Sequence, residues 1–257
     1  MSEEMKVLRE QLLRNDKNGY DTLDEAQLAE MEAYCADYKA FLNEGKTERL
    51  SARAAIAAAE AKGFVQYKRG MALKAGDKVY TCNRGKGLML AVIGKESLAE
   101  GVQIAAAHID SPRLDLKPTP LYEDSEMAYF KTHYYGGIRK YQWVTIPLQL
   151  RGVVAKKDGS VVDVCIGEAG EPQLVITDLL PHLGAEQNDR KLSEGIKAEE
   201  LNVLIGSDAV EDADIKEAVK LNTLMLLHEK YGITERDFTR AEIEIVPAYN
   251  CLLYTSP

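Results

Sequence analysis

The sequence predicts an α/β protein in which a mostly parallel sheet, flanked by helices, is interrupted by a separate β-rich module. Two observations carry this prediction. A short apolar run, GVQIAAA at 101–107, is bounded by glycine and charge, as strands buried inside parallel sheets are. After Pro118 the sequence alternates in the manner of antiparallel strands, before a helix and a strand restore the α/β pattern.

Two helices and a hairpin are expected before the apolar run. Apolar residues three and four apart predict a helix from Leu23 to Gly45, and Thr47 is expected to cap a second helix that ends at Gly63. Two extended segments then follow, joined by a glycine-containing turn, which is typical of a hairpin. They cover 78–82 and 88–93, with the turn at 83–87.

The β-rich module is expected to begin near residue 119. It contains the alternating segments 142–154 and 161–166 with a turn at 157–160, a polar stretch at 186–200, and an apolar strand at 201–205. An amphipathic helix from Asp212 to Tyr231, ended by Gly232, and a strand at 241–246 come next.

We therefore expect four segments: a first part of the α/β domain (1–118), the β-rich domain (119–207), the resumed α/β domain (208–250) and a non-native tail (251–257). Two interpretations of the β-rich domain stay open at this point. It either packs only on the first domain or mediates assembly.

The composition is that of a globular protein with an acidic surface. Of its 257 residues, 46% are hydrophobic and 28% are charged, and the formal net charge is -9. This charge, together with the lack of basic clusters with interleaved aromatic residues, argues against a nucleic-acid partner. No apolar run approaches the roughly 18 residues of a membrane span, and the acidic start does not resemble a signal peptide. We therefore expect a cytoplasmic protein with no membrane partner, whose four widely spaced cysteines are reduced.

The segment AAAHIDSPRLDLKP holds the most informative polar residues. His108 and Asp110 follow the apolar run and are two residues apart, so they share one side of an extended chain at the end of the expected strand. Imidazole is a zinc ligand, and a nearby carboxylate can orient the ring. The pattern fits half of a metal site, and it also fits a hydrogen-bonded pair without a metal.

The other three histidines are less informative. His133, in KTHYYGG, is expected in an aromatic turn, and His228 lies near the end of the amphipathic helix, where it has a structural role. His182, in LLPHLG, follows a proline, and its local sequence does not distinguish a helix cap from a functional residue.

Four segments together resemble the M18 family of metallo-aminopeptidases, the aspartyl-aminopeptidase relatives. They are AAAHIDSPRLDLKP, KTHYYGGIRKYQWVTIPLQLRGVV, EELNVLIGS and AEIEIVPAY, in this order between about Thr47 and Tyr249. The resemblance implies a zinc-peptidase domain interrupted by a β-rich dimerisation domain, with dimers that build a dodecamer. It also implies that His108 is a ligand of one of two metal ions, that Asp110 orients His108, and that His182 reaches a partner subunit's active site to steady the substrate.

The resemblance also implies that the family's other metal ligands and its general base, a glutamate, would lie downstream of this sequence. The final residues, CLLYTSP, do not resemble the family's continuation, and CLLYTS is the translation expected of a sequencing-library adapter. We therefore expect an amino-terminal fragment that lacks the C-terminal part of the fold and is itself inactive.

The function expected of the parent protein is hydrolysis of N-terminal residues from peptide substrates by two divalent metal ions, zinc or alternatively cobalt or manganese. Two alternatives stay open. One is a catalytically dead assembly or regulatory subunit of the same fold. The other is a different metal hydrolase on the same sheet, which the long β insertion disfavours.

Overall fold

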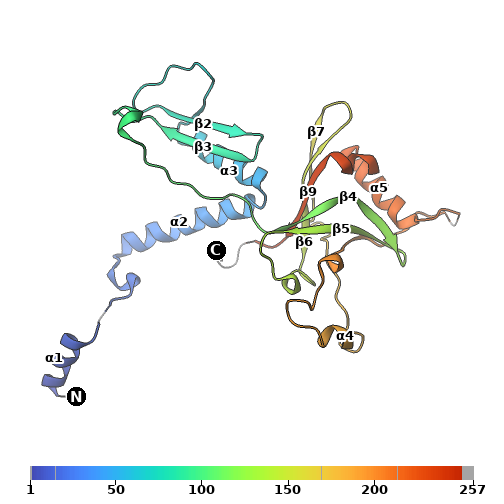
Figure 1. Ribbon diagram of the computed structural model, residues 1–257, viewed down its shortest axis with the longest axis horizontal. Helices are drawn as coiled ribbons and strands as arrows, with labels where there is room; N and C mark the ends of the chain where they lie inside the picture. The colour runs from blue at the N-terminus through green and yellow to red at the C-terminus, as the bar shows by residue number, and fades with distance from the viewer. Residues whose placement is uncertain (1, 15, 169, 213, 251–257) are drawn as a thin grey trace.

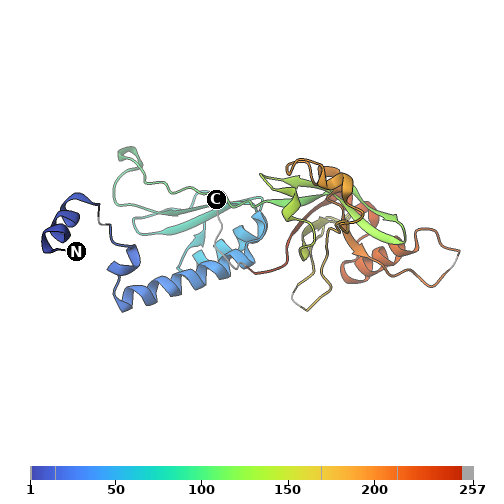
Figure 2. The same cartoon turned by 90° about the horizontal axis from the view of Figure 1, so that it is seen from below.

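The computed structural model describes residues 2–14, 16–168, 170–212 and 214–250. Within these ranges the strands form two sheets, and Figure 1 shows them as two bodies. The first body holds the three-stranded sheet and the second holds the six-stranded sheet. The segment 101–112 connects them. Viewed from below, α2 and α3 run along one side of the first sheet, and α1 lies beyond its far end (Figure 2). The expected α/β class, with sheets flanked by helices, is confirmed.

The predicted N-terminal helices are present. They are α2 (Glu25–Glu44) and α3 (Glu48–Ala61), preceded by α1 (Glu3–Leu12). Asp24 and Gln27 form a capping box that begins α2, and the Thr47 hydroxyl accepts from the Leu50 amide at 3.3 Å to begin α3. These side chains satisfy amides that the first helical turn leaves without partners. Gly63, with φ +84°, follows α3 as expected of a C-terminal glycine.

The three-stranded sheet contains the predicted hairpin. Its strands are β1 (Val65–Gln66), β2 (Lys78–Asn83) and β3 (Gly87–Val92) in that order. Strands β2 and β3 are antiparallel, with Asn83 opposite Gly87, and Arg84 and Gly85 take positive φ in the turn between them. Strands β1 and β2 are the parallel pair among the described strands. The strands of the larger sheet pair antiparallel, because short turns join β4 to β5 and β6 to β7.

The predicted strand at 101–107 is wrong. The segment is irregular in the structure and its residues are exposed, Ile104 to 81% and Val102 to 62%. A strand that is buried on both faces needs neighbouring strands and covering helices, and no described element takes those places beside 101–107. His108 and Asp110 therefore lie in the connection just before β4, and not at the end of a buried strand.

The six-stranded sheet has the order β7-β6-β9-β4-β5-β8. Its strands are β4 (Arg113–Asp124), β5 (Met127–Tyr135), β6 (Leu148–Ala155), β7 (Val161–Ile166), β8 (Val203–Gly206) and β9 (Ala241–Pro247). Short helices complete the path: η1 (Gly19–Thr22), η2 (Leu98–Glu100), η3 (Lys140–Gln142), α4 (Ala185–Asn188), η4 (Ala198–Glu200) and η5 (Glu235–Arg240).

Strand β9 lies between β6 and β4, in the interior of this sheet. Residues 208–250, which we expected to return to the first domain, thus place their strand among those of the β-rich region. Strand β4 likewise begins at Arg113, before the expected boundary at 118. The suspected tail at 251–257 lies outside the described residues.

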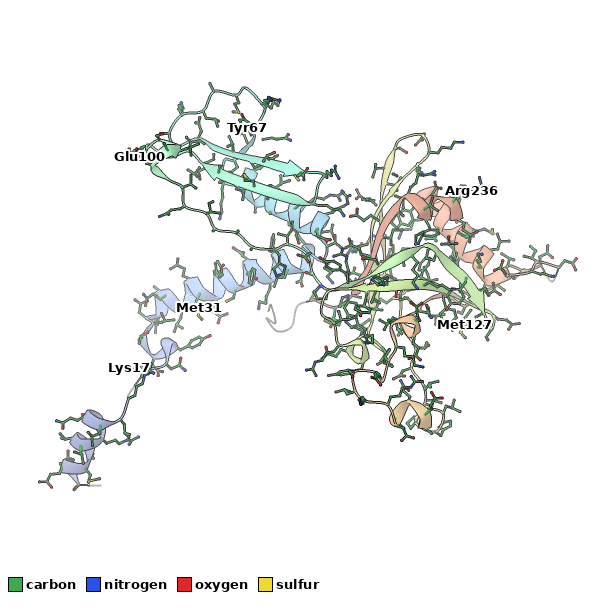
Figure 3. The ribbon with its side chains drawn as sticks, viewed as in Figure 1. Lys17, Met31, Tyr67, Glu100, Met127 and Arg236 are labelled. Atoms are coloured by element: carbon green, nitrogen blue, oxygen red, sulfur yellow. The ribbon has the colours of Figure 1, made fainter. Side chains whose placement is uncertain are left out.

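The principal core lies between the six-stranded sheet and α5 (Ala218–Tyr231). Phe130 on β5 is fully buried and meets Phe238 of η5 edge to face, with ring centroids 5.6 Å apart. Figure 3 shows side chains crowded between the strands and α5, whereas Met127, at the β4–β5 turn, lies at the periphery. This core is large enough to make the sheet a stable platform for the residues at its edges.

Helix α5 begins at Ala218, six residues later than predicted. The Asp212 carboxylate accepts from the Asp214 amide, and Glu217 takes a left-handed conformation with φ +56°. Aspartate side chains that bond to nearby amides compete with helix formation, which accounts for the late start. The end is as predicted: Gly232 is left-handed and its amide donates to the His228 carbonyl at 2.7 Å.

Gly152 on β6 permits a close approach of two strands. Its φ is +155°, and a Cβ placed there would lie 2.1 Å from the Glu242 carbonyl oxygen on β9. Only glycine, which has no Cβ atom, fits at this position in the β6–β9 pairing.

The boundary between the two bodies contains a buried ionic cluster. The Arg113 guanidinium lies 2.8 Å from a Glu48 oxygen of α3, 2.8 Å from an Asp115 oxygen of β4, and 3.5 Å from a Glu244 oxygen of β9. Arg113 and Glu244 are buried. Nearby, Arg49 of α3 bonds both carboxylate oxygens of Glu242, at 2.9 and 3.0 Å. The first body is thus held against the sheet by charged groups from α3, β4 and β9.

Glu244 has the most perturbed carboxyl group of this cluster. Burial raises its pKa from the ordinary 4.5 to about 8, and the neighbouring carboxylates of Glu48 and Asp115 act in the same direction, against the attraction of Arg113. Three carboxylates surround one guanidinium, so a proton on Glu244 relieves repulsion that Arg113 alone does not cancel.

This raised pKa predicts a pH-dependent stability. Between about pH 4.5 and 8 the folded chain keeps a proton on Glu244 that the unfolded chain has released, so the free energy of unfolding falls as the pH rises through this window. In Glu244→Gln this part of the fall should be absent. Urea unfolding at several pH values measures it.

Glu242→Gln is the matched control, because Glu242 lies two residues away on the same strand. Burial disfavours its charge, but the bonds from Arg49 and Lys86 outweigh burial and lower its pKa. This variant should lose roughly 1 kcal/mol at neutral pH and keep most of the fall between pH 4.5 and 8, because the Glu242 charge is the smallest of the causes that raise the pKa of Glu244. An unchanged pH profile in Glu244→Gln would show that Glu244 does not hold the proton.

Candidate metal-binding site

His108 and Asp110 contact each other in the segment that leads into β4. The Nδ1 atom of His108 lies 2.9 Å from the backbone oxygen of Asp110 and 3.2 Å from its Oδ1. Both oxygens are acceptors at neutral pH, so Nδ1 carries the proton. Nε2 is then the basic nitrogen of the ring, and the His108 side chain is 65% exposed. This is the tautomer that a metal-binding histidine needs when a carboxylate orients it.

The hydroxyl of Tyr135 holds the second oxygen of Asp110. Tyr135 Oη donates to Asp110 Oδ2 at 2.9 Å, from the end of β5. This hydrogen bond, more than the partial burial that opposes it, holds the pKa of Asp110 below its ordinary value, and it raises the pKa of Tyr135. Asp110 is therefore a charged acceptor for both His108 and Tyr135 at neutral pH.

Sequence reasoning missed Tyr135. The KTHYYGG segment was expected to form an aromatic turn, but His133, Tyr134 and Tyr135 belong to β5, and the turn begins at Gly136. His133 is exposed, and its ring stacks on Tyr134 with centroids 5.6 Å apart. Only the pairing of β5 with β4 brings Tyr135 to Asp110, and that pairing has no local signal in the sequence.

The two remaining histidines lie elsewhere. His228 of α5 contacts the Ile233 carbonyl through Nδ1 at 3.1 Å, at the helix C-terminus. His182 is exposed in a turn before α4, beside the exposed side chains of Leu179, Leu180 and Leu183. No hydrogen bond or ion pair among the described residues joins His182 to His108 or Asp110.

The described residues supply part of a metal site. They contain no group of three or more His, Cys, Asp and Glu side chains arranged to hold a metal ion. His108, with its basic Nε2 exposed, fits one ligand position, and Asp110 fits the carboxylate behind it. A catalytic zinc ion takes three protein ligands, so this pair is one portion of such a shell.

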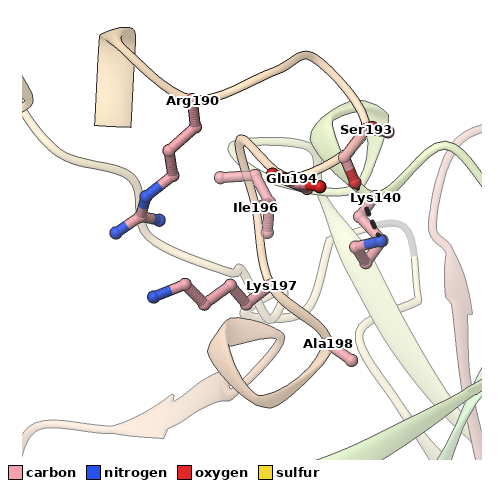
Figure 4. Close-up of a pocket in the computed structure, with 7 residues that line it drawn as sticks. All are labelled: Lys140, Arg190, Ser193, Glu194, Ile196, Lys197 and Ala198. Atoms are coloured by element: carbon pink, nitrogen blue, oxygen red, sulfur yellow. Dashed lines mark hydrogen bonds between the residues drawn. The ribbon is translucent and has the colours of Figure 1, made fainter. Parts of the chain in front are cut away.

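A pocket of about 390 Å³, drawn in Figure 4, is lined by residues other than His108 and Asp110. Its lining is formed by Lys140, Arg190, Ser193, Glu194, Ile196, Lys197 and Ala198. Arg190 already pairs with Glu186 at 3.0 Å and Glu200 at 3.2 Å, and Lys140 donates to the Ser193 carbonyl at 3.3 Å. The pocket's cations therefore have protein partners.

Among the described helices, none is both long and apolar enough to cross a membrane.

Comparison with known proteins identifies relatives that match most of this chain. The model of the family described as Aminopeptidase I zinc metalloprotease (M18) matches residues 41–254. A probable M18 family aminopeptidase 1 of Clostridium acetobutylicum is 50% identical over 242 residues, which are 92% of this chain and 52% of the relative. This chain thus spans about half the length of the curated relatives it matches.

Comparison with solved structures gives the same family. An M18 family aminopeptidase from Thermotoga maritima superposes with a TM-score of 0.85 at 41% identity, covering 93% of this chain and 52% of that one. The dodecamer of yeast mApe1 has a TM-score of 0.60 at 15% identity, over 86% of this chain and 49% of that one, which shows a shared fold. The family match and these similarities show that the chain belongs to the M18 family of zinc metallo-aminopeptidases.

Proposed function

We propose that this chain is part of a metal-dependent aminopeptidase that removes N-terminal residues from peptides. Membership of the M18 family, whose description names a zinc metalloprotease, supports the reaction class. The observation that carries the role of this chain is the His108–Asp110 contact, which leaves Nε2 as the basic nitrogen of a largely exposed side chain. The use of two metal ions, and of zinc in preference to cobalt or manganese, belongs to this proposal.

In the proposed mechanism His108 is a ligand of one metal ion. A bound divalent metal would supply Lewis acidity toward the scissile carbonyl and lower the pKa of a water. Asp110 keeps the proton of His108 on Nδ1 and fixes the plane of the ring, so that Nε2 points away from the backbone. The carboxylate also makes the imidazole a stronger electron donor.

We also propose that the β-rich region mediates self-association into dimers and a dodecamer, in which His182 acts in a partner's active site. Support comes from the dodecameric relative and from the position of His182. It lies in an exposed turn with three exposed leucines, a surface that a second subunit would cover. The division at 119 and 207 and a cytoplasmic location stay predictions.

The test of the proposed function uses a full-length protein that contains this chain together with the length its relatives have beyond it. It should release N-terminal residues from peptides, lose this activity to a chelator, and regain it when zinc, cobalt or manganese is added. The 257-residue chain should show no measurable activity in the same assay, because one histidine does not make a complete ligand shell. A full-length protein that binds metal and assembles but releases no amino acid would instead be an assembly or regulatory subunit.

A further inference from the structure

Tyr135 is placed between the ionic cluster and the His108–Asp110 pair. Arg113 and Tyr135 are directly opposite each other in the antiparallel pair of β4 and β5. Opposite residues point to the same face of a sheet, and the Arg113 guanidinium lies 4.0 Å from the centroid of the Tyr135 ring. The ring is therefore stacked on a charged group, which favours this orientation of the side chain.

Arg113 is itself fixed. Its side chain is 9% exposed, and oxygens of Glu48 and Asp115 each approach its guanidinium to 2.8 Å. The Nε–H group donates to Asp115, and the Glu48 and Glu244 carboxylates attract the guanidinium as ion-pair partners, so one hydrogen bond and two ionic contacts restrict its movement. Because the Tyr135 ring stacks on this guanidinium, the restricted movement of Arg113 also restricts the ring.

The end of β5 and the segment before β4 also approach each other closely next to the Tyr135 ring. A Cβ built on Gly136, the residue after Tyr135, would lie 3.6 Å from the Cα of Pro112, and Gly136 has φ +84°. The end of β5 thus lies directly against the segment that carries Asp110. The distance that the Tyr135 hydroxyl must span is set by backbone packing.

The two carboxylate oxygens of Asp110 face different groups. Oδ2 accepts from Tyr135 at 2.9 Å, and Oδ1 lies 3.2 Å from Nδ1 of His108, whose hydrogen bond is to the backbone oxygen of Asp110 at 2.9 Å. A carboxylate with one oxygen held cannot rotate about its Cβ–Cγ bond without breaking that hydrogen bond. Tyr135 therefore selects the orientation in which the other oxygen faces His108.

We propose that Tyr135, stacked on Arg113, is a positioning residue that orients the Asp110 carboxylate and, through it, His108. The inference that this sets metal affinity rests on the proposed function. The inference that it sets the orientation and proton position of His108 does not, because it follows from contacts present without metal.

The first experiment uses the metal-free 257-residue chain. ¹⁵N NMR of the histidine rings at alkaline pH reports which ring nitrogen carries the proton. We expect His108 to be mainly Nδ1-protonated, and Tyr135→Phe, which keeps the ring on Arg113, should lower that population toward the value in Asp110→Asn. Tyr129→Phe is the matched control, since the Tyr129 hydroxyl contacts only the Met127 sulfur, at 3.6 Å, among its described hydrogen-bond partners. His108→Gln identifies the signal.

The second experiment measures zinc affinity of the full-length protein by competition with a chelator. Tyr135→Phe should weaken binding by about 10-fold, at the lower end of the range for groups that support a ligand, and Tyr129→Phe should not change it. In an Asp110→Asn background, Tyr135→Phe should have no further effect. This non-additivity is the result expected of a residue that acts through Asp110.

An unchanged proton position of His108 in Tyr135→Phe would overturn the proposal. It would also be overturned if the zinc-affinity losses of Tyr135→Phe and Asp110→Asn were independent, so that the double variant lost the product of the two factors. A changed proton position in a full-length protein without peptidase activity would support the positioning role and reject the proposed function. Peptidase activity of the full-length protein, with no effect of Tyr135→Phe on the proton position or on zinc affinity, would support the proposed function and reject the positioning role.

Discussion

Replacing His108 by alanine in the full-length protein should reduce aminopeptidase activity to less than about a hundredth of the wild-type rate. The substitution removes a proposed metal ligand, and even changes in groups that only support ligands cost about 10–100-fold. Metal content, measured on the purified protein by elemental analysis, should fall with the activity. Thermal unfolding of the metal-free protein should hardly change, because the His108 side chain is 65% exposed.

His182→Ala separates a role in catalysis from a role in folding. If His182 acts in a partner's site, this variant should lose roughly 10²–10³ in kcat while its metal content and assembly stay unchanged. Mixed oligomers of the His108 and His182 variants should then regain activity, because some sites combine both wild-type residues. Demonstrated subunit exchange without regained activity would exclude the role across subunits.

Gly152→Ala should prevent stable folding of the six-stranded sheet, or lower the free energy of unfolding by at least about 4 kcal/mol. The added methyl group would lie 2.1 Å from the Glu242 carbonyl oxygen, so β6 and β9 must separate where they pair. Denaturant unfolding followed by circular dichroism measures the loss.

Gly159→Ala provides the comparison. Gly159 also has positive φ, +88°, but no atom lies within 4 Å of a Cβ built there. Its substitution should therefore cost only the backbone strain, about 1 kcal/mol. Equal losses in the two variants would mean that the approach of β6 to β9 is not the cause.

The sequence predicted elements whose signals are local. Thr47 and Gly232 mark helix ends because their effects act within one turn, and the hairpin of β2 and β3 follows from its glycine-containing turn. The start of α5 was predicted too early, because periodicity does not reveal a competing contact such as that between Asp212 and Asp214.

Errors arose where the outcome depends on distant partners. The run at 101–107 has the composition of a buried strand, but burial requires neighbours that no local pattern specifies. The interior position of β9 in the larger sheet also depends on pairing with β6 and β4, although the domain division itself stays a prediction. His108 and Asp110 were identified because they are two residues apart. Tyr135, which follows Asp110 by 25 positions, was not.

The contacts described at the boundary between the two bodies are ion pairs and hydrogen bonds, including Arg49 with Glu242 and Arg53 with Asp163. Apolar packing, by contrast, stabilises the interior of the larger sheet. Ionic strength therefore affects the boundary between the two bodies more than the interior of the larger sheet. Dissolved salt screens exposed pairs such as Arg53–Asp163, whereas it acts much less on the buried Arg113 and Glu244 and leaves the hydrophobic interior of the sheet intact. The exposed ion pairs between the two bodies are accordingly the contacts at this boundary that depend most on the surrounding electrolyte.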